Sequence, residues 1–288
     1  MSLKNKRIVF CSFVFLFFLN VLAWSTVFDL NSQSLEVVFF DVDQGDAIFI
    51  ETPQEHQILI DGGPSSIILE KLGKEMPFWD RTIDLIILTH PEHDHIAGLI
   101  EVLKRYRVEQ VLWTGVVQET GEYKEWQELL EKQGAEITIS QTGQQIIFTG
   151  GGIEILHPFQ SLQGEKTKSV NNTSIVARLV FGGNSFLFTG DAFKSVERKL
   201  VKKGVKLVSD VLKVGHHGSK TSSAAEFIEK VSPEIAVIQC GKDNRYGHPH
   251  PETLATLEKF GIKILRTDLK GDIKIVSNGN YVKIENEK

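Results

Sequence analysis

The feature that most constrains how this chain folds is the polar run THPEHDH at residues 89–95. An apolar, β-branched stretch at 83–88 precedes it and predicts a buried strand, and a helical pattern opens after it at Ile96. Three histidines and two carboxylates in one short run are more typical of a metal site than of a turn, because turns usually carry Asn, Gly and Ser. In α/β proteins, ligand-binding side chains gather where a strand end leads into a helix. The run therefore predicts an α/β fold with a metal centre at one edge of a sheet.

The second half of the chain places further candidate ligands after two more apolar stretches. Asp191 follows SFLFTG, and His216 and His217 follow DVLKVG. A lone aspartate after a strand is more commonly a helix cap, and paired histidines can form a hydrogen-bonded shelf. Their position beside a histidine-rich run favours a shared site instead. We expect Asp191 at a surface crevice, where its carboxylate can bridge two ions.

Cysteine content and charge narrow the chemistry of this site. Cys11 and Cys240 are the only cysteines, which is too few for a disulfide framework or a thiolate zinc cluster, so His, Asp and Glu must hold any metal. Such oxygen and nitrogen ligands suit Zn, Mn or Fe. All 37 acidic residues and all but three of the 32 Lys and Arg follow Phe28, which leaves the body a net charge of -8. An acidic body argues against wrapping long nucleic acid tightly, but it is compatible with a metal-mediated grip on a short stretch.

Hydrophobic periodicity predicts one body of alternating strands and helices over residues 29–288. Predicted strands lie at 35–42, 47–51, 57–61, 83–89, 110–113, 146–148, 153–156, 174–181, 185–189, 210–214 and 236–240. Predicted helices lie at 66–74, 97–106, 123–133, 193–203, 224–230 and 251–260. Ser223 and Glu226 match a capping box, and Pro251 suits a first helical position. Hairpins followed by mixed βα units predict two sheets back to back with helices outside, a four-layer αββα sandwich.

An uncharged apolar segment precedes this body. Residues 8–28 contain no charge and are long enough to cross a bilayer as a helix, and they follow the cations Lys4, Lys6 and Arg7. Positive-inside bias then places the body outside the cytoplasm. Residues 1–28 are predicted to be either an uncleaved signal anchor or a cleaved signal peptide. The apolar run is longer than the usual signal peptide core, which favours a membrane-anchored over a secreted protein.

Motifs spread in order along the body resemble the metallo-β-lactamase superfamily. HPEHDH followed by IAGL is similar to its signature H-x-H-x-D-H, and TGD is similar to its later bridging aspartate. The resemblance is closer to the extracytoplasmic hydrolase domain of the ComEC-type competence proteins, which internalise DNA. The motifs that carry it are FFDVDQGDAIFIETP, ILIDGGP, LTHPEHDHIAGL, NNTSIVARLVF, FLFTGDA, DVLKVGHHGSKTSS, NRYGHPHPETL and RTDLKGDI.

The resemblance implies a hydrolytic site with one or two divalent ions, Zn or Mn. Its metal ligands would be His90, Glu92, Asp94, His95, Asp191 and one of His216 and His217. We assign His216 to the metal and expect Asp94 and His217 to act in catalysis. Asp61 and Asn172 are expected as structural neighbours of the site. Expected substrate contacts, as donors facing a phosphodiester, are Ser219, Lys220, Asn244 and His248.

Two positions depart from the general signature. Glu92 stands where the general signature has a second histidine, and the competence subfamily carries an acidic residue there. A carboxylate makes the site harder and more anionic, which favours Mn over Zn. The usual third histidine is also missing, and Asn171, Asn172 and Ser174 occupy its place, as in the subfamily.

The leading functional hypothesis is a metal-dependent phosphodiesterase or nuclease that acts on DNA outside the cytoplasmic membrane. Divalent ions in the site would activate water and polarise a phosphoryl or carbonyl oxygen. The alternatives are a hydrolase of a small-molecule ester, lactone or phosphodiester, and a non-catalytic surface-binding module. The expected partners are a nucleic acid or other phosphodiester substrate and the membrane, and no protein partner is predictable from the sequence.

Overall fold

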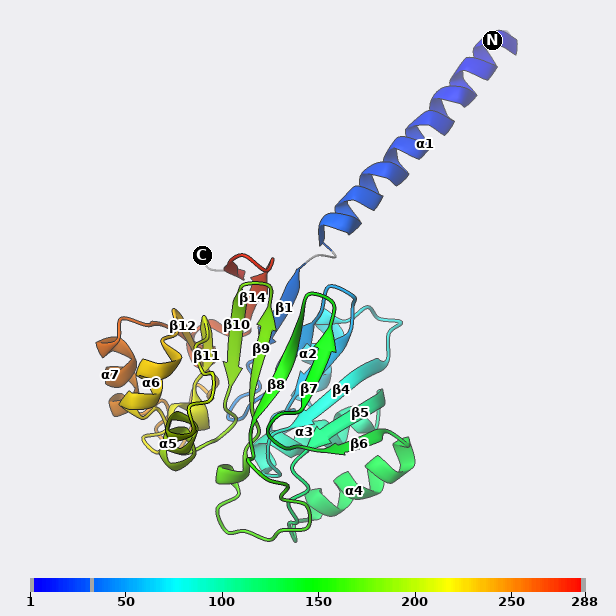
Figure 1. Ribbon diagram of the computed structural model, residues 1–288. Helices are drawn as coiled ribbons and strands as arrows, with labels where there is room; N and C mark the ends of the chain where they lie inside the picture. Colours follow the sequence, from blue (N-terminus) through cyan, green and yellow to red (C-terminus); the bar gives the residue numbers. More distant parts are fainter. Residues whose placement is uncertain (1–2, 32–33, 286–288) are drawn as a thin grey trace.

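The computed structural model describes residues 3–31 and 34–285 and shows two mixed sheets packed face to face between helices (Figure 1). The predicted four-layer αββα sandwich is confirmed. The first sheet has the strand order β15 (Val282–Glu285), β14 (Ile273–Ser277), β1 (Leu35–Phe39), β2 (Ile48–Glu51), β3 (Gln57–Ile60), β4 (Thr82–Leu88), β5 (Arg107–Trp113) and β6 (Glu136–Ile139). The second has the order β13 (Lys263–Arg266), β12 (Ile235–Ile238), β11 (Val211–Lys213), β10 (Asn184–Phe188), β9 (Val176–Phe181), β8 (Gly151–His157) and β7 (Gln145–Phe148).

Three apolar cores hold the layers together. The middle core joins the inner faces of the two sheets, with Phe39 of the first packed near Phe188 of the second. The first sheet's outer face packs against α2 (Ile67–Glu75), α3 (His93–Leu103) and α4 (Gly121–Gln133). The second sheet's outer face packs against α5 (Lys194–Lys203), α6 (Ala225–Val231) and α7 (Pro251–Lys259). A short α8 (Thr267–Lys270) follows β13. Burial of apolar side chains on both faces of each sheet explains why most strands are apolar runs rather than strict alternations.

Strand directions define two ends of the sandwich. In the first sheet β1, β3, β4, β5 and β6 run the same way, and in the second β10 to β13 do so. We call the end where these strands finish the site edge. The opposite end, where β1 begins, is the tether edge, because only residues 32–34 separate β1 from α1 (Leu3–Asn31). The two sheets also meet at the tether edge, where Gly183 N donates to Gly279 O at 2.6 Å.

Several local expectations are corrected by the structure. The helix after the histidine run begins at His93 rather than near Ile96, because Glu92 is the extended N-cap residue. Strand β6 was not predicted, because its residues are mostly exposed and carry no buried apolar pattern. The capping box at Ser223 is wrong: Ala224 is the N-cap of α6 and its side chain makes no capping bond. Pro251 is confirmed as the first residue of α7.

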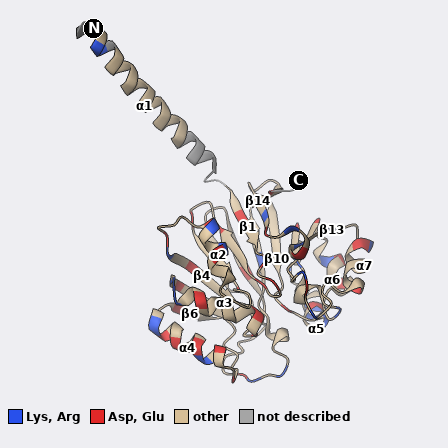
Figure 2. Ribbon diagram, turned by 180° about the vertical axis from the view of Figure 1, so that it is seen from behind, with Lys and Arg blue, Asp and Glu red and all other residues tan. Residues whose placement is uncertain are grey.

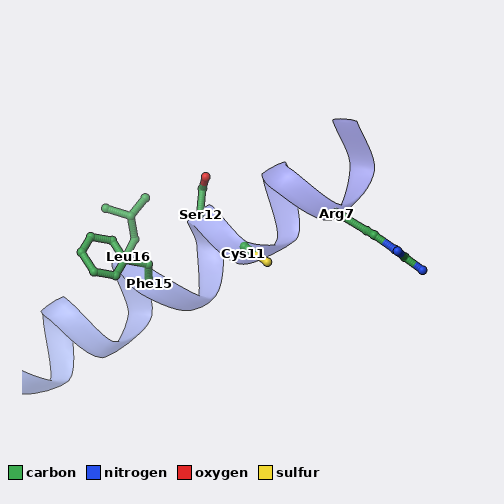
Figure 3. Close-up of a pocket in the computed structure, with 5 residues that line it drawn as sticks. All are labelled: Arg7, Cys11, Ser12, Phe15 and Leu16. Atoms are coloured by element: carbon green, nitrogen blue, oxygen red, sulfur yellow. The ribbon is translucent and has the colours of Figure 1, made fainter. Parts of the chain in front are cut away.

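Helix α1 projects from the body as an isolated helix (Figure 1). Residues 5–24 form one helical stretch that is long and apolar enough to cross a membrane, and none of it is buried against the protein. Figure 3 shows Arg7, Cys11, Ser12, Phe15 and Leu16 projecting from this helix, and Figure 2 shows a basic patch near its start. Phe10, Phe13 and Phe17 are each at least 66% exposed. The predicted boundary between residues 28 and 29 lies inside the helix, which continues to Asn31.

Candidate metal centre

The polar side chains of the candidate site lie on loops and on a helix start at the site edge. His90 follows β4, Asp191 follows β10, and the first turn of α3 carries Asp94 and His95. His217 lies on a short 3-10 turn, Gly215–Gly218, directly after β11. Its backbone has φ 52°, a left-handed conformation that costs free energy for any residue other than glycine. The chain therefore maintains a strained turn at the point where this imidazole enters the site.

Four side chains from both halves of the chain converge as a group that can hold a metal ion. Ligand atoms of Asp94, His95, Asp191 and His217 all lie within 4.8 Å of one another. Asp191 Oδ2 lies 3.5 Å from His95 Nε2 and 3.4 Å from His217 Nε2. His217 Nε2 is also 3.2 Å from Asp94 Oδ2. The first half of the chain supplies Asp94 and His95, and the second half supplies the other two.

A second layer of acceptors orients the two imidazoles. Asp61 Oδ2 lies 2.8 Å from His95 Nδ1, and Asp61 accepts hydrogen bonds from the backbone N–H and hydroxyl of Thr89. His217 Nδ1 lies 3.0 Å from the carbonyl of Gln239 and 3.2 Å from Asp46 Oδ1. An imidazole whose Nδ1 proton is held in this way presents its Nε2 lone pair to the centre. Both rings are therefore set as nitrogen ligands.

The unsatisfied atoms of the centre fit a divalent cation. His90 Nε2, His95 Nε2 and Asp191 Oδ1 are buried, and none has a hydrogen-bond partner within residues 3–31 and 34–285. Buried polar atoms are normally satisfied, so several that face each other indicate a ligand. Imidazole nitrogens and carboxylate oxygens are ligands that Zn, Mn and Fe accept. The donor set thus fits the metal that the sequence predicts.

His90 and Glu92 offer a less complete set of ligands beside this group. His90 Nε2 is 3.9 Å from Glu92 Oε2, and the His90 ring lies against His95 with ring centroids 4.1 Å apart. Glu92 keeps 38% of its side chain exposed, whereas His90 is fully buried. The buried Asn171 occupies the place of a third histidine, with its amide nitrogen 3.4 Å from Asp191 Oδ2. A second ion at this position would have fewer protein ligands than one in the four-residue group.

The charges of the centre shift the pKa values in directions that favour metal binding. Burial lowers the pKa of His90 to about 3, so its imidazole is neutral at physiological pH. Burial also acts to lower the pKa of His217, but the carboxylates of Asp191 and Asp46 raise it well above its usual value. Burial acts to raise the pKa of Asp191, but His217 and His95 hold it well below its usual value. Burial acts to lower the pKa of His95 as well, but Asp191 and Asp61 raise it well above its usual value. Protons on His95 and His217 therefore balance the carboxylates, and a divalent cation would displace them.

Two residues of the centre were missed by sequence reasoning. Lys213 is fully buried and pairs with Asp46, and its Nζ donates to the carbonyl of Gly190 at 3.0 Å. The same Nζ lies 3.9 Å from Asp191 Oδ1. The sequence signal for Lys213 was a lone cation inside the apolar strand DVLKV. Asp46 gave a weaker signal, a carboxylate in a Gly-containing loop that only the fold brings beneath His217.

The structure places the predicted neighbours of the metal at different distances from it. His217 rather than His216 belongs to the four-residue group. His216 Nδ1 pairs with Thr221 Oγ1 at 2.8 Å, and its Nε2 is 3.8 Å from Asp191 Oδ2 on the more open side. Asp191 is 1% exposed, so the expectation of a surface crevice for this residue is wrong. Asn172 lies farther out, bonded to Ser169 and Ser195.

Of the four expected substrate contacts, two are bonded within their own loops and two are accessible to a ligand. Asn244 donates its side-chain amide to the carbonyls of Gly241 and His248, so it shapes its own loop. Ser219 is buried, and its hydroxyl accepts from Thr221. Lys220 is exposed and His248 is half-buried. Of the four residues, Lys220 and His248 are thus the most available to a ligand.

A pocket of about 300 Å³ opens beside the metal group. The residues that line it are Asp43, Gln44, Pro64, His93, Asp94, Asp243, Asn244, Arg245 and Tyr246. At its rim, Tyr246 stacks on His248 with ring centroids 5.8 Å apart and an interplanar angle of 22°. The Arg245 guanidinium lies 5.4 Å from the centre of the Tyr246 ring. Asp94 is the member of the metal group that reaches this pocket.

Comparison with known proteins gives the same family as the motifs. The model of the metallo-beta-lactamase superfamily matches residues 40–242. ComE operon protein 3 of Bacillus subtilis is 34% identical over 282 residues, which cover 92% of this chain and 35% of that protein. Competence protein ComA of Neisseria gonorrhoeae is 33% identical over 239 residues, which cover 83% of this chain and 32% of that protein. This chain thus spans about a third of the length of these relatives.

A solved structure supports the fold. The metallo-beta-lactamase fold protein YhfI from Bacillus subtilis superposes with a TM-score of 0.53 at 14% identity. The match covers 86% of this chain and 99% of that one. At this identity the likeness concerns the arrangement of the sheets and helices alone. The resemblance inferred from the motifs is confirmed by the family and the two relatives.

Proposed function

This chain belongs to the metallo-β-lactamase superfamily and is a metal-dependent hydrolase related to competence proteins, and from this premise we propose that it cleaves phosphodiester bonds of DNA. The observation that carries the proposal is the pairing of the metal group with the stacked rim of Tyr246 and His248. Aromatic faces beside a cationic side chain are how proteins hold single-stranded nucleic acid without reading its sequence. A small ester or lactone has no base that could stack on these rings.

The residues of the chain would divide the chemistry among them. Asp94, His95, Asp191 and His217 would hold the ion, which supplies a Lewis acid for the phosphoryl oxygen and for water. Burial acts to raise the pKa of Asp94, but the hydrogen bond from His217 and the charge of His95 hold it below its usual range. Asp94 is therefore ionised at neutral pH, and its position at the pocket suits it to bind the ion and to orient a water molecule there. Lys220 and Arg245 are exposed cations that can face the backbone phosphates.

The proposed location is the outer face of the cytoplasmic membrane. The cations at the start of α1 and the apolar stretch that follows them in the same helix support this orientation. The anchored form is favoured because α1 continues without a break beyond the apolar run, to Asn31. A cleaved, secreted form is the alternative. Protease protection of the body in intact cells, compared with permeabilised cells, distinguishes an outer from an inner location.

The activity is tested with the purified full chain, stripped of metal and reloaded with Mn or Zn. We expect cleavage of single-stranded DNA by the wild type and none by Asp94→Asn from the same preparation. Glu122→Gln is the matched control, because Glu122 is an exposed carboxylate that contacts His93 outside the metal group. Hydrolysis of bis-p-nitrophenyl phosphate without DNA cleavage would contradict the nuclease proposal, and hydrolysis of a lactone alone would favour a carbonyl substrate.

The rim is tested separately by Tyr246→Ala and Tyr246→Phe. Loss of one stacking platform costs about 1–3 kcal/mol per base, so we expect KM for single-stranded DNA to rise by roughly tenfold in Tyr246→Ala. Tyr246→Phe keeps the ring and should behave like the wild type. Neither variant should change hydrolysis of bis-p-nitrophenyl phosphate. An equal loss on both substrates would mean that Tyr246 supports the fold of its loop and does not bind a base.

A further inference from the structure

The tether edge lies close to any membrane that holds α1. Only residues 32–34 separate the end of α1 from Leu35, the first residue of β1. At about 3.5 Å per residue, this link spans at most about 14 Å. The helical residues 25–31 after the apolar stretch add about 10 Å at about 1.5 Å per residue, so Leu35 lies within about 25 Å of the bilayer. Other side chains that project from the tether edge are therefore brought near the same bilayer.

One loop at the tether edge presents an exposed aromatic pair. The segment between α2 and β4 carries Phe78 and Trp79, which are 80% and 74% exposed, with their rings in edge-to-face contact at 4.8 Å. This loop reaches the tether edge because β4 runs parallel to β3 and therefore in the direction of β1 (Figure 1). Tryptophan is enriched at the membrane–water interface, and phenylalanine accompanies it on the apolar face of segments that lie there.

The loop is held in place although its tip is exposed. Asp80 N donates to the carbonyl of Pro77 at 2.9 Å, which closes the turn that carries the two rings. The Asp80 carboxylate accepts from Thr82 N at 2.9 Å and from the Gln57 amide at 2.8 Å. Met76, just before the turn, is buried. A braced turn with two outward aromatic rings is a preformed contact that loses little conformational entropy on binding.

Cations surround a pocket next to this aromatic pair. The pocket measures about 360 Å³ and is lined by Leu69, Gly73, Arg81, Arg105 and Tyr106. The Arg81 guanidinium donates to the hydroxyl of Tyr106 at 3.3 Å and to the backbone carbonyl of Asp80 at 3.4 Å. Arg105 is exposed just after the end of α3, and Arg107 starts β5 with 77% of its side chain exposed and lies 3.8 Å from Glu109 Oε1. These cations stand out on a body whose net charge is -8.

We propose that Phe78 and Trp79, with Arg81 and Arg105, form a lipid-contact surface that rests on the anionic headgroups of the bilayer that holds α1. The aromatic rings enter the interfacial layer, and the guanidinium groups pair with lipid phosphates beside them. The occupant is a lipid surface rather than a second copy of the chain, because the short link from α1 already brings this edge to a membrane. This proposal rests on membrane insertion of α1 and is independent of the nuclease activity.

The contact has a consequence for the substrate. The seven residues of β4 span about 23 Å at 3.3 Å per residue, and they separate the lipid-contact surface from His90. A body docked at the tether edge therefore holds the metal centre on the far side, open to water. A water-borne polymer can reach such a centre, whereas the phosphodiester of a membrane lipid cannot.

The test is a depth measurement on the full chain in vesicles. A spin label is placed at Phe78→Cys in a Cys11→Ser background, and the buried Cys240 is left in place. The matched control is Leu269→Cys, which is 70% exposed but lies in α8 at the site edge. In vesicles of phosphatidylcholine with phosphatidylglycerol, we expect the label at 78 to collide more with oxygen than with a water-soluble nickel complex. The label at 269 should show the reverse.

The role of the arginines is tested by their removal. Arg81→Gln with Arg105→Gln should lower the ratio of docked to undocked labels roughly 30-fold, since each cation near an anionic leaflet contributes about 1 kcal/mol. Lys270→Gln, at the site edge, is the charge control and should have no effect. Equal exposure of labels 78 and 269 to water would overturn the proposal. A lipid signal that vanishes on diluting the protein in the bilayer would also overturn it, because the surface would then join two copies.

Discussion

Asp191 connects the two halves of the metal group, since its carboxylate contacts one histidine from each. Its change to Asn keeps the shape but removes the anion that faces His95 and His217. We expect activity to fall by about a thousandfold or more, because a metal contributes several kcal/mol to transition-state stabilisation. Metal content by mass spectrometry should fall with it, while circular dichroism stays native. Retention of both metal and activity would remove Asp191 from the ligand set.

We expect Glu92 to influence which metal supports activity best, because its carboxylate lies 3.9 Å from His90 Nε2 beside the metal group. Its carboxylate is a hard, anionic ligand, and Glu92→His would replace it with a softer, neutral nitrogen. We expect the ratio of Mn-supported to Zn-supported activity to fall in Glu92→His. His93→Ala is the control, because His93 faces Glu122 rather than the centre. An unchanged ratio in Glu92→His would place this side chain outside the coordination sphere.

The elements show why sequence patterns predicted some parts of the fold better than others. Strands such as β4 and β10 were predicted because their apolar runs are buried by both layers. Strand β6 was missed because a strand at the end of a sheet, with exposed side chains, lacks that pattern. The start of α3 was placed too late because its first turn carries metal-binding residues instead of apolar ones. Where metal-binding residues take the place of apolar ones, the hydrophobic pattern that predicts a helix is interrupted.

The start of α6 gives a direct comparison of a predicted cap with the observed one. Glu197 of α5 is 1% exposed and accepts from the backbone N–H groups of Ser223 and Ala224, both at 2.7 Å. Glu197→Ala leaves two buried donors unpaired and should lower the free energy of unfolding by about 2–4 kcal/mol. Ser223→Ala should cost less than about 0.5 kcal/mol, because Ala224 rather than Ser223 is the N-cap residue of α6. Urea unfolding of both variants measures the difference, and the opposite order would restore the capping box.

Glu197 also predicts a dependence of stability on pH. Burial raises its pKa to about 7 in the folded protein, above its usual value of 4.5. Between these values the folded state binds more protons than the unfolded state, so this group's contribution to stability falls as pH rises from about 4.5 to 7. Glu197→Gln cannot titrate, so the stability of the wild type relative to this variant should decline by roughly 3 kcal/mol across that window. A difference that is constant with pH would contradict the raised pKa.

The fold of the whole molecule brings residues from distant motifs together in one metal centre. The sequence marked His90, Asp94, His95 and Asp191 as polar groups at strand ends, and the fold brings them to one edge. It could not show that Asp46 lies beneath His217 or that Lys213 joins them, because those contacts span more than 160 residues of chain. The choice between His216 and His217 likewise depends on a strained turn that no local pattern encodes.

A metal held by both halves should stabilise the whole sandwich. Asp94 and His95 come from the first sheet's edge and Asp191 and His217 from the second's, so unfolding of either half destroys the site. An ion at a hundred times its Kd should then add about 2.7 kcal/mol to the free energy of unfolding. We expect Tm to rise with added Mn or Zn and to fall with a chelator, and the response should disappear in His217→Ala. His56→Ala is the control, since His56 is exposed at the tether edge beside Asp84. An equal rise of Tm with metal in His217→Ala and in the wild type would mean that ions bind elsewhere. Metal-dependent protection from hydrogen exchange in only one half of the chain would show that the two sheets unfold separately.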